Sequence, residues 1–174
     1  GVSDSEVNPE ILTHTNYLWS LDTMFDDLDS DTKKNRSAIL RNISTGRTVG
    51  QDLEGVENQG VEIRKLIING IKAFLGIPKR LRADQGSELT IATCRWLEML
   101  GTKLDPRVPY NPRRIASNDV SHRELRHTMK SVATTARLSG VDLTRQEIID
   151  LSCILYDNRP RLRSDGKYLS NLLI

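Results

Sequence analysis

Leu81-Arg-Ala-Asp84-Gln-Gly86-Ser87-Glu88 is the stretch that decides the fold of this chain of 174 residues. Residues 78–84 are typical of a short strand, and the glycine turn behind them places Asp84 at the strand end. Apolar residues at helical spacing before this stretch (63–74) and after it (89–100) predict a helix on either side. Such alternation favours an α/β fold with a mixed sheet, in which ligands gather beyond the carboxyl ends of parallel strands. We therefore expect Asp84 at a ligand-binding edge.

The remaining patterns predict one compact domain, with a polar leader (1–16) before a core (17–174). The core begins with a buried strand near 16–25. Further expectations are a solvated turn at 26–34, a hairpin over 37–50 with its turn near Gly46, a strand at 102–106, a mobile arginine-rich loop at 107–118, a helix from Asp119 or Val120 to Leu138, a helix opened by the capping box Thr144–Glu147, and a short helix from Lys167.

Asp22 lies inside the apolar strand of 16–25, where a charge is costly unless it is paired or binds a metal. Residues 1–32 contain eight acids and no Lys or Arg, whereas residues 107–130 carry six Lys or Arg against two acids. Acids that hold cations beside bases that hold phosphates would suit a metal-dependent phosphodiester enzyme. Ordinary solvated surface explains the same charges, so this alternative stays open.

Three carboxylates are candidates for a metal site. Phosphodiester transfer uses divalent cations about 3.5–4 Å apart, and magnesium prefers oxygen ligands. Asp22 and Asp84 come from two central strands, and Glu124 would add a third carboxylate from a helix. His122 and His127 flank Glu124. Contact with nucleic acid and simple exposure to solvent explain these two histidines equally well.

Cys94 and Cys153 lie inside apolar helical patterns, and the chain has no zinc-type spacing of Cys and His. We expect two buried, reduced thiols and an intracellular compartment. No stretch is apolar enough to cross a bilayer, and the first residues lack the pattern of a signal peptide, so we expect no membrane contact.

Five segments follow one another in an order typical of a known family. They are Trp19-Ser-Leu-Asp22, Gly76–Thr90 with its Asp84-Gln-Gly-Ser-Glu88, Pro109-Tyr-Asn-Pro112, Leu125-Arg-His-Thr-Met-Lys130 and Tyr156-Asp-Asn-Arg-Pro160. Together they resemble the landmarks of the catalytic core of a retroviral or gypsy-like LTR-retrotransposon integrase. The resemblance covers nearly the whole chain from about Tyr17, and the segment at Asp84 is its most specific part.

This resemblance implies an RNase H-like fold, namely a mixed five-stranded sheet flanked by helices. It also implies a site in which Asp22, Asp84 and Glu124 bind Mg²⁺ (or Mn²⁺) for the processing of DNA ends and their transfer into target DNA. A homodimer or larger assembly, a nuclear location after cytoplasmic synthesis, and further domains outside this fragment are implied too. The residues expected to hold DNA are Arg113, Arg114, Arg123, Arg126 and Lys130.

The third acid departs from the family pattern. Counting the usual interval from Asp84 leads to Val120, and alignment by the segment that ends at Lys130 puts Arg123 in the glutamate position and Glu124 in the arginine position. Either the helix is shifted so that Glu124 reaches the metals, or the site is degenerate. Asp119 is a less favoured substitute because it is expected at the helix cap.

Two functions therefore remain open, and a third is disfavoured. The first is a DNA integrase core. The second is an integrase-derived domain that binds DNA or a protein partner without cutting. A different RNase H-like nuclease or transposase fits the ordered segments less well.

Overall fold

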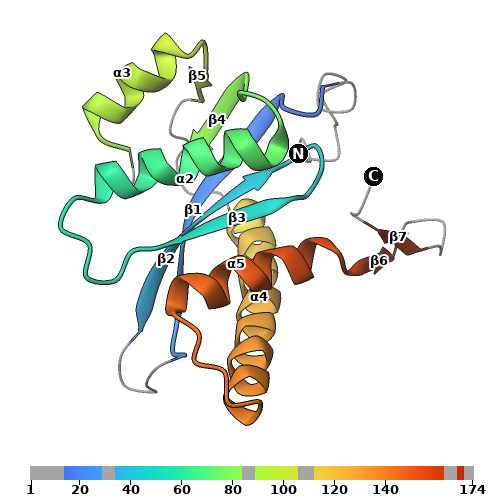
Figure 1. The fold of residues 1–174 in the computed structure, drawn as a ribbon. Coiled ribbons are helices and arrows are strands. Elements are labelled where there is room, and N and C mark those ends of the chain that lie inside the picture. The colour runs from blue at the N-terminus through green and yellow to red at the C-terminus, as the bar shows by residue number, and fades with distance from the viewer. Residues whose placement is uncertain (1–13, 29–33, 84–88, 106–111, 163–167, 171–174) are drawn as a thin grey trace.

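A computed structural model describes residues 14–28, 34–83, 89–105, 112–162 and 168–170, with the side chains of 14–28, 34–83, 89–105 and 121–159 among them. At the centre is a five-stranded sheet in the order β3-β2-β1-β4-β5 (Figure 1). Neighbours β1, β2 and β3 are antiparallel, whereas β4 and β5 continue from β1 in parallel. The predicted mixed five-stranded sheet is therefore confirmed. The strands are β1 (Leu18–Asp26), β2 (Asn35–Asn42), β3 (Thr48–Asp52), β4 (Arg80–Ala83) and β5 (Lys103–Leu104).

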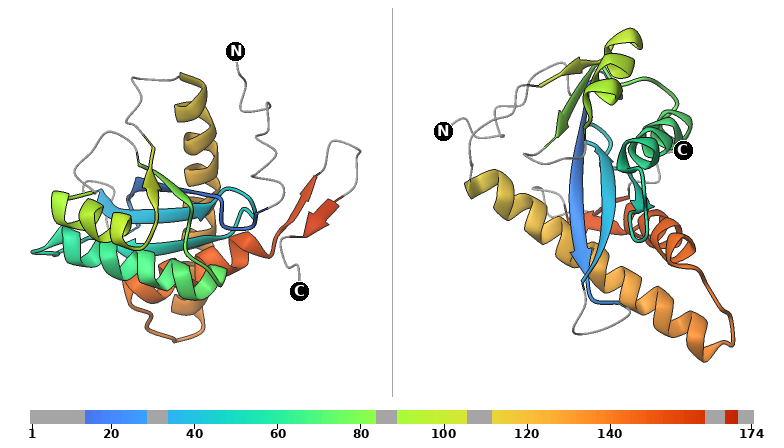
Figure 2. Two further views of the ribbon diagram at one scale, coloured as in Figure 1. Left: turned by 90° about the horizontal axis from the view of Figure 1, so that it is seen from above. Right: turned by 90° about the vertical axis from the view of Figure 1, so that its left-hand side faces the viewer.

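Helices cover both faces of this sheet because its strands alternate buried residues in two directions. On one face, Trp19, Leu21 and Leu40 form a core with α2 and α3. Met24 and Ile39 point to the other face and form a second core with residues of α4 and α5. Figure 2 shows α4 crossing the sheet on the side away from α2. The helices are α2 (Gln59–Phe74), α3 (Ile91–Met99), α4 (Pro112–Leu138) and α5 (Arg145–Asp157).

Two local signals in the sequence are confirmed. The hairpin between β2 and β3 turns at Gly46, whose φ of 75° is one that glycine adopts without strain. Thr144 opens α5 with both hydrogen bonds of the expected capping box. No helix within the described ranges is long and apolar enough to cross a membrane.

The two cysteines are free, as expected. Cys153 is buried in the second core, whereas Cys94 is only half-buried. Burial raises the pKa of the Cys153 thiol to about 12, so this thiol stays protonated at neutral pH.

The start of α4 corrects one expectation. The helix begins at Pro112 rather than at Asp119 or Val120, so residues 112–118 belong to the helix and not to the predicted loop. Proline is tolerated in the first helical turn because the N–H it lacks has no partner there. Asp119 therefore lies inside α4 and is not its cap.

The end of the chain corrects another expectation. The predicted short helix from Lys167 is wrong, because Tyr168–Ser170 forms strand β7. This strand pairs antiparallel with β6 (Pro160–Leu162), and together they make a separate two-stranded sheet. Strand pairing thus overrides a local helical preference.

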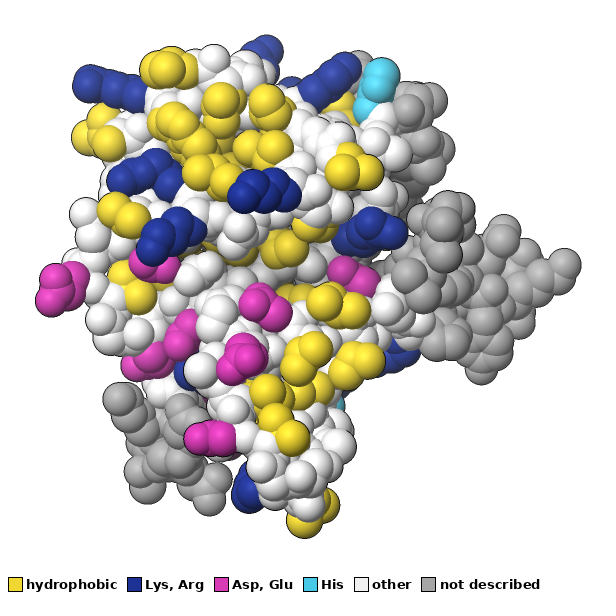
Figure 3. All heavy atoms as spheres, in the orientation of Figure 1, with side chains coloured by type: hydrophobic (Ala, Val, Ile, Leu, Met, Phe, Trp, Pro, Cys, Tyr) yellow, Lys and Arg dark blue, Asp and Glu magenta, His cyan; other side chains and the backbone are white. Residues whose placement is uncertain are grey.

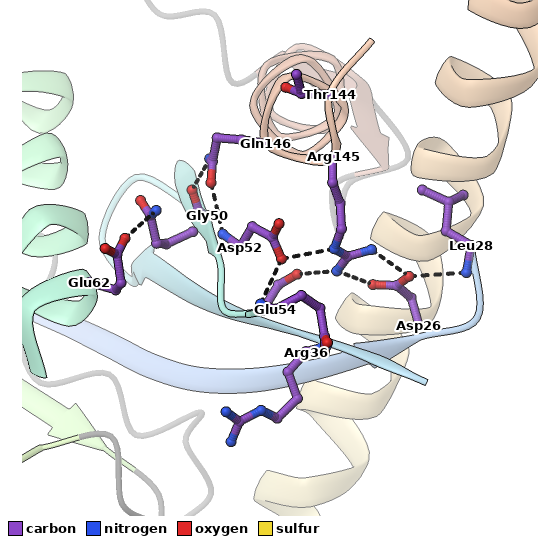
Figure 4. Close-up of polar contacts among 12 residues, drawn as sticks. Asp26, Leu28, Arg36, Gly50, Asp52, Glu54, Glu62, Thr144, Arg145 and Gln146 are labelled. Carbon is purple, nitrogen blue, oxygen red and sulfur yellow. Dashed lines mark hydrogen bonds and ion pairs between the residues drawn. The ribbon is translucent and has the colours of Figure 1, made fainter. Parts of the chain in front are cut away.

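The sequence predicted that Asp26 belongs to a solvated turn. In the structure Asp26 is instead buried at the end of β1 and forms an ion pair. The Arg145 guanidinium donates two hydrogen bonds to its carboxylate, at 2.9 and 2.8 Å, and a third to Asp52 at 2.9 Å. Figure 4 shows Arg145 reaching from α5 to both acids. The side chains of Asp26 and Arg145 are only 4% and 11% exposed. This cluster ties the end of β1 to the first turn of α5, a long-range contact that no local pattern indicates.

Candidate active site

Asp22 lies on the face of β1 that is turned toward α4. Alternation along the strand places it on the same side as Met24, which packs against Leu125 and Met129 of α4. The Asp22 carboxylate lies 3.9 Å from Nε2 of His122, and the two side chains are 13% and 14% exposed. A carboxylate and an imidazole thus face each other in a largely enclosed position. His122 was not predicted as a neighbour of Asp22, although its spacing of three and seven residues from Leu125 and Met129 signals the sheet-facing side of the helix.

The second predicted carboxylate, Asp84, lies outside the described residues. What the structure does show is the strand that leads to it. β4 is parallel to β1, with Ala83 opposite Leu21. Both strands therefore run toward the same edge of the sheet, and Asp22 and Asp84 each follow directly after one member of this last pair. Bound molecules and ions commonly lie just beyond the carboxyl ends of parallel strands.

Glu124 is bound to α5 and the residues that follow it. Its Oε2 accepts a hydrogen bond from the Arg159 guanidinium at 2.5 Å and one from the Tyr156 hydroxyl at 3.5 Å. The Arg159 guanidinium lies over the Tyr156 ring, 4.6 Å from its centroid, which adds a cation–π contact. The Tyr156 hydroxyl also contacts the Ser121 hydroxyl at 3.2 Å. These partners of Glu124 were not predicted, because they depend on how α4 and α5 pack together.

The predicted DNA-binding residues of α4 lie along β1. Arg126 donates a hydrogen bond to the Phe25 carbonyl at 3.2 Å, and Lys130 pairs with Asp27 at 3.5 Å. Arg123 is exposed and has no shown ion pair within the described part of the chain. These three residues, with His122, His127 and Lys34, line a cavity of about 360 Å³ beside the end of β1. The side chains of Arg113 and Arg114 lie outside the described residues.

The donor set determines which cation fits. Carboxylate and imidazole are both metal ligands, and a carboxylate is the donor that magnesium prefers. Within the ranges that the structure describes, no group of three His, Cys, Asp or Glu side chains is placed to hold a metal. Asp22, His122 and Glu124 therefore do not converge. A site at Asp22 fits a divalent cation only together with carboxylates from beyond the described side chains.

The fold can be compared with that of known proteins. A chain of the simian T-cell lymphotropic virus intasome, in complex with PP2A regulatory subunit B56 gamma, is 15% identical with a TM-score of 0.66, covering 88% of this chain and 52% of that one. The catalytic core domain of BIV integrase is 16% identical with a TM-score of 0.57, covering 88% and 90%. The HTLV-2 integrase catalytic core domain, in complex with magnesium in a dimeric form, is 14% identical with a TM-score of 0.59, covering 88% and 92%.

The chain has the fold of a retroviral integrase catalytic core. The predicted RNase H-like architecture is therefore confirmed. This integrase-core fold spans about half of the intasome chain that it matches. At the level of sequence, no family model and no curated protein matches the chain.

Proposed function

We propose that this integrase-core domain catalyses metal-dependent processing of DNA ends and their transfer into target DNA. The observation that carries the proposal is the position of Asp22, a largely enclosed carboxylate on the central strand. Its parallel neighbour β4 ends one residue before Asp84. A charge in an apolar strand is costly unless it is paired or binds a metal, and a metal ion bound beside the His122 imidazole would compensate the Asp22 carboxylate.

Three acidic residues of the chain would bind the metal ions. Asp22 and Asp84 hold Mg²⁺ (or Mn²⁺), with a third acid from α4 completing the site. The bound cations would activate the attacking oxygen and stabilise the leaving oxygen. Glu124, the acid expected from the sequence, joins them only if it gives up its contacts with Arg159 and Tyr156.

Basic residues along α4 would hold the DNA backbone. Arg123, Arg126 and Lys130 line the cavity beside β1, and Arg113 and Arg114 precede them in the same helix. Phosphate contacts of this kind position a DNA strand without reading its sequence. Their affinity depends on salt because each contact releases bound counterions. Action on chromosomal DNA places the protein in the nucleus.

A strand-transfer assay with a labelled DNA end and a plasmid target tests this function. We expect joined products with Mg²⁺ or Mn²⁺, and none when EDTA removes the cation. Binding of the same DNA should weaken roughly tenfold or more between 50 and 200 mM salt, because several phosphate contacts are involved. Salt-dependent DNA binding without joined products under either cation would contradict catalysis and support the second function below.

The second candidate is a domain that keeps the integrase-core fold and binds DNA or a protein partner without cutting. The ion pair between Glu124 and Arg159 favours it, since this pair holds the expected third ligand away from Asp22. In that case the affinity of the basic side of α4 for DNA would be the same with and without a divalent cation.

We also propose that the domain forms a homodimer through the face made by α2, α3 and α5. Exposed apolar side chains are frequent there, including Met99 at 83% and Ile154 at 56%. Figure 3 shows hydrophobic side chains over both halves of this face, with Lys and Arg mainly around the upper half and Asp and Glu mainly across the lower. The exposed basic residues include Lys65, Lys72 and Arg95, and the exposed acids include Glu147 and Asp150.

A two-fold axis would place the basic half of one copy against the acidic half of the other. The HTLV-2 core is itself described in a dimeric form, which supports this proposal. Ile154→Glu puts a charge into the apolar part of the face and should weaken dimerisation about tenfold or more. Analytical ultracentrifugation measures the change, with Leu138→Glu at the exposed end of α4 as the matched control. Equal sedimentation of both variants and the wild type would contradict this dimer face.

A further inference from the structure

The face of the sheet that carries Asp22 continues onto β4. Leu81 and Ala83 of β4 belong to the core formed with α2 and α3. Because side chains alternate along a strand, Arg80 and Arg82 lie on the opposite face, which is the face of Asp22. In the parallel register Arg82 is level with the residue two places before Asp22. With a rise of about 3.3 Å per residue and a strand spacing of about 4.8 Å, the Cα atoms of Arg82 and Asp22 are roughly 8 Å apart.

β5 adds a third cation to the same face. Leu104 packs against the core on the side of α2 and α3, so Lys103 and Asp105 on either side of it point the other way. Lys103 is exposed and lies opposite Arg80 in the parallel register. Asp105 contacts both Arg80 and Arg82. On this face of β4 and β5, the described charged residues are therefore three cations and one acid.

Asp105 compensates Arg80 more closely than Arg82. Its Oδ1 accepts a hydrogen bond from Nε of Arg80 at 2.5 Å, whereas its Oδ2 lies 3.5 Å from Nε of Arg82. This longer contact uses Nε alone, so it does not occupy the two terminal nitrogens of the Arg82 guanidinium. The Arg82 side chain is 30% exposed. Arg82 and Lys103 therefore carry the surplus positive charge of this surface.

Asp22 lies between this surface and the basic cavity of α4. Along β1, Arg82 is level with Ser20, whereas the cavity beside the end of β1 begins at Thr23. Among the described residues, the second core includes none from β4 or β5, so the packing of α4 and α5 does not bury Arg82 and Lys103. Two separate groups of cations thus flank one carboxylate.

Transfer of a DNA end into a target brings two DNA segments to one site. The terminal hydroxyl of the end attacks a target phosphorus, so that one P–O bond forms and another breaks, and the proton passes through solvent to the leaving oxygen. A DNA end can terminate inside a cavity. A continuous target duplex has no end near the reacting phosphate, so it needs an open surface that it can cross. The face of β4 and β5 is such a surface.

We propose that Arg82 and Lys103 bind the phosphate backbone of the target DNA and position it at Asp22, while the basic residues of α4 hold the DNA end. This inference rests on the proposed function, because it concerns the second substrate of the same site. Arg82 can bind a phosphate with two parallel N–H groups, and Lys103 adds a point charge. Neither contact reads the base sequence.

The test compares a DNA without ends with a short DNA end, using the whole 174-residue chain. The probes are a covalently closed DNA minicircle and a short labelled duplex that mimics a DNA end, both followed by fluorescence anisotropy. The double variant Arg82→Gln with Lys103→Gln should bind the minicircle about tenfold or more weakly, with a slope of log affinity against log salt that is smaller by about two. Its affinity for the end duplex should stay within about threefold of the wild type, whereas Arg126→Gln with Lys130→Gln should mainly weaken binding of the end duplex.

Arg137→Gln is the matched control for the loss of a positive charge. Arg137 is exposed and lies fifteen residues beyond His122, about 22 Å further along α4. Arg82→Lys keeps the charge and should recover most of the minicircle binding. Thermal melting shows whether a loss of binding comes from unfolding. If Arg82→Gln melts early, the exposed substitution Lys103→Gln decides alone, with a salt slope smaller by about one.

Failure of this inference and failure of the proposed function give different results. In the strand-transfer assay, the double variant should need about tenfold more target for half-maximal joining, while joining at saturating target and processing of DNA ends are kept. Equal weakening of both probes, or unchanged minicircle binding, would overturn the inference alone. Minicircle binding that depends on Arg82 and Lys103 without joined products in the wild type supports this DNA surface and contradicts catalysis. A wild type that binds neither probe overturns both.

Discussion

Replacing Arg145 with methionine should lower the free energy of unfolding by about 3 kcal/mol or more, which is a large part of the stability of a small domain. Arg145 is the cation that compensates Asp26 and Asp52 at the junction of β1, β3 and α5. Burial by itself lowers the pKa of the Arg145 guanidinium, but the hydrogen bonds to Asp26 and Asp52 outweigh it and raise this pKa above its usual value. The guanidinium therefore stays charged at every pH at which the protein is folded.

The loss comes mainly from the acids that remain. The Asp26 carboxylate is 4% exposed in the wild type, and without Arg145 it would keep a backbone hydrogen bond from Leu28 but no cation among the residues that the structure describes. Leaving one partner of a buried pair uncompensated costs more than removing the pair. The double variant Arg145→Met with Asp26→Asn should therefore recover at least part of the lost stability.

Urea denaturation followed by circular dichroism measures these changes. The matched control is Arg95→Met, which removes an exposed arginine of α3 and should change the free energy of unfolding by roughly 0.5 kcal/mol or less. A similar small effect for Arg145→Met would show that the cluster does not hold α5 to the sheet.

Much of the fold could be predicted because local patterns and long-range contacts agree. The apolar run around Asp22 became β1, and the capping box at Thr144 opens α5 as expected. The sequence also indicated that Asp22 is a charged residue inside an apolar strand. In the structure it lies there, and its carboxylate faces the His122 imidazole. At these places, strand propensity, capping chemistry and burial all favour one structure.

The parts that could not be predicted depend on contacts between distant segments. Asp26 has the neighbours of a solvated turn in sequence, and only the packing of α5 supplies Arg145 to compensate it. For a related reason, the sequence alone did not decide which acid of α4 would be the third metal ligand. Which acid of α4 faces β1 depends on the rotation of the helix, and this rotation is fixed by burial of Leu125 and Met129 against both the sheet and α5.

The start of α4 bears on the interpretation of Asp119 in the same way. A helix expected to begin at residue 119 makes this aspartate a natural cap, and capping explains an acid without any metal. A helix that begins at Pro112 removes that explanation. The predicted start of this helix is thus wrong by about two turns, whereas the predicted end at Leu138 is confirmed.

Asp22→Asn should separate activity from stability at the proposed site. We expect strand transfer to fall roughly a thousandfold or more, because the amide no longer supplies the negative charge that stabilises the cations. Asp84→Asn should behave in the same way. The melting temperature should stay unchanged or rise, since the variant removes a charge that is costly in an apolar strand.

An opposite pattern is expected at an acid of comparable exposure with a structural role. Asp105 is 14% exposed and pairs with Arg80 and Arg82, and this contact raises the pKa of the Arg80 guanidinium. Asp105→Asn should therefore lower the free energy of unfolding by about 1 kcal/mol while strand transfer is largely retained. If Asp22→Asn instead destabilised the protein as Asp105→Asn does and kept its activity, Asp22 would be a packing residue paired with His122. The carboxylate on the central strand would then have no catalytic meaning.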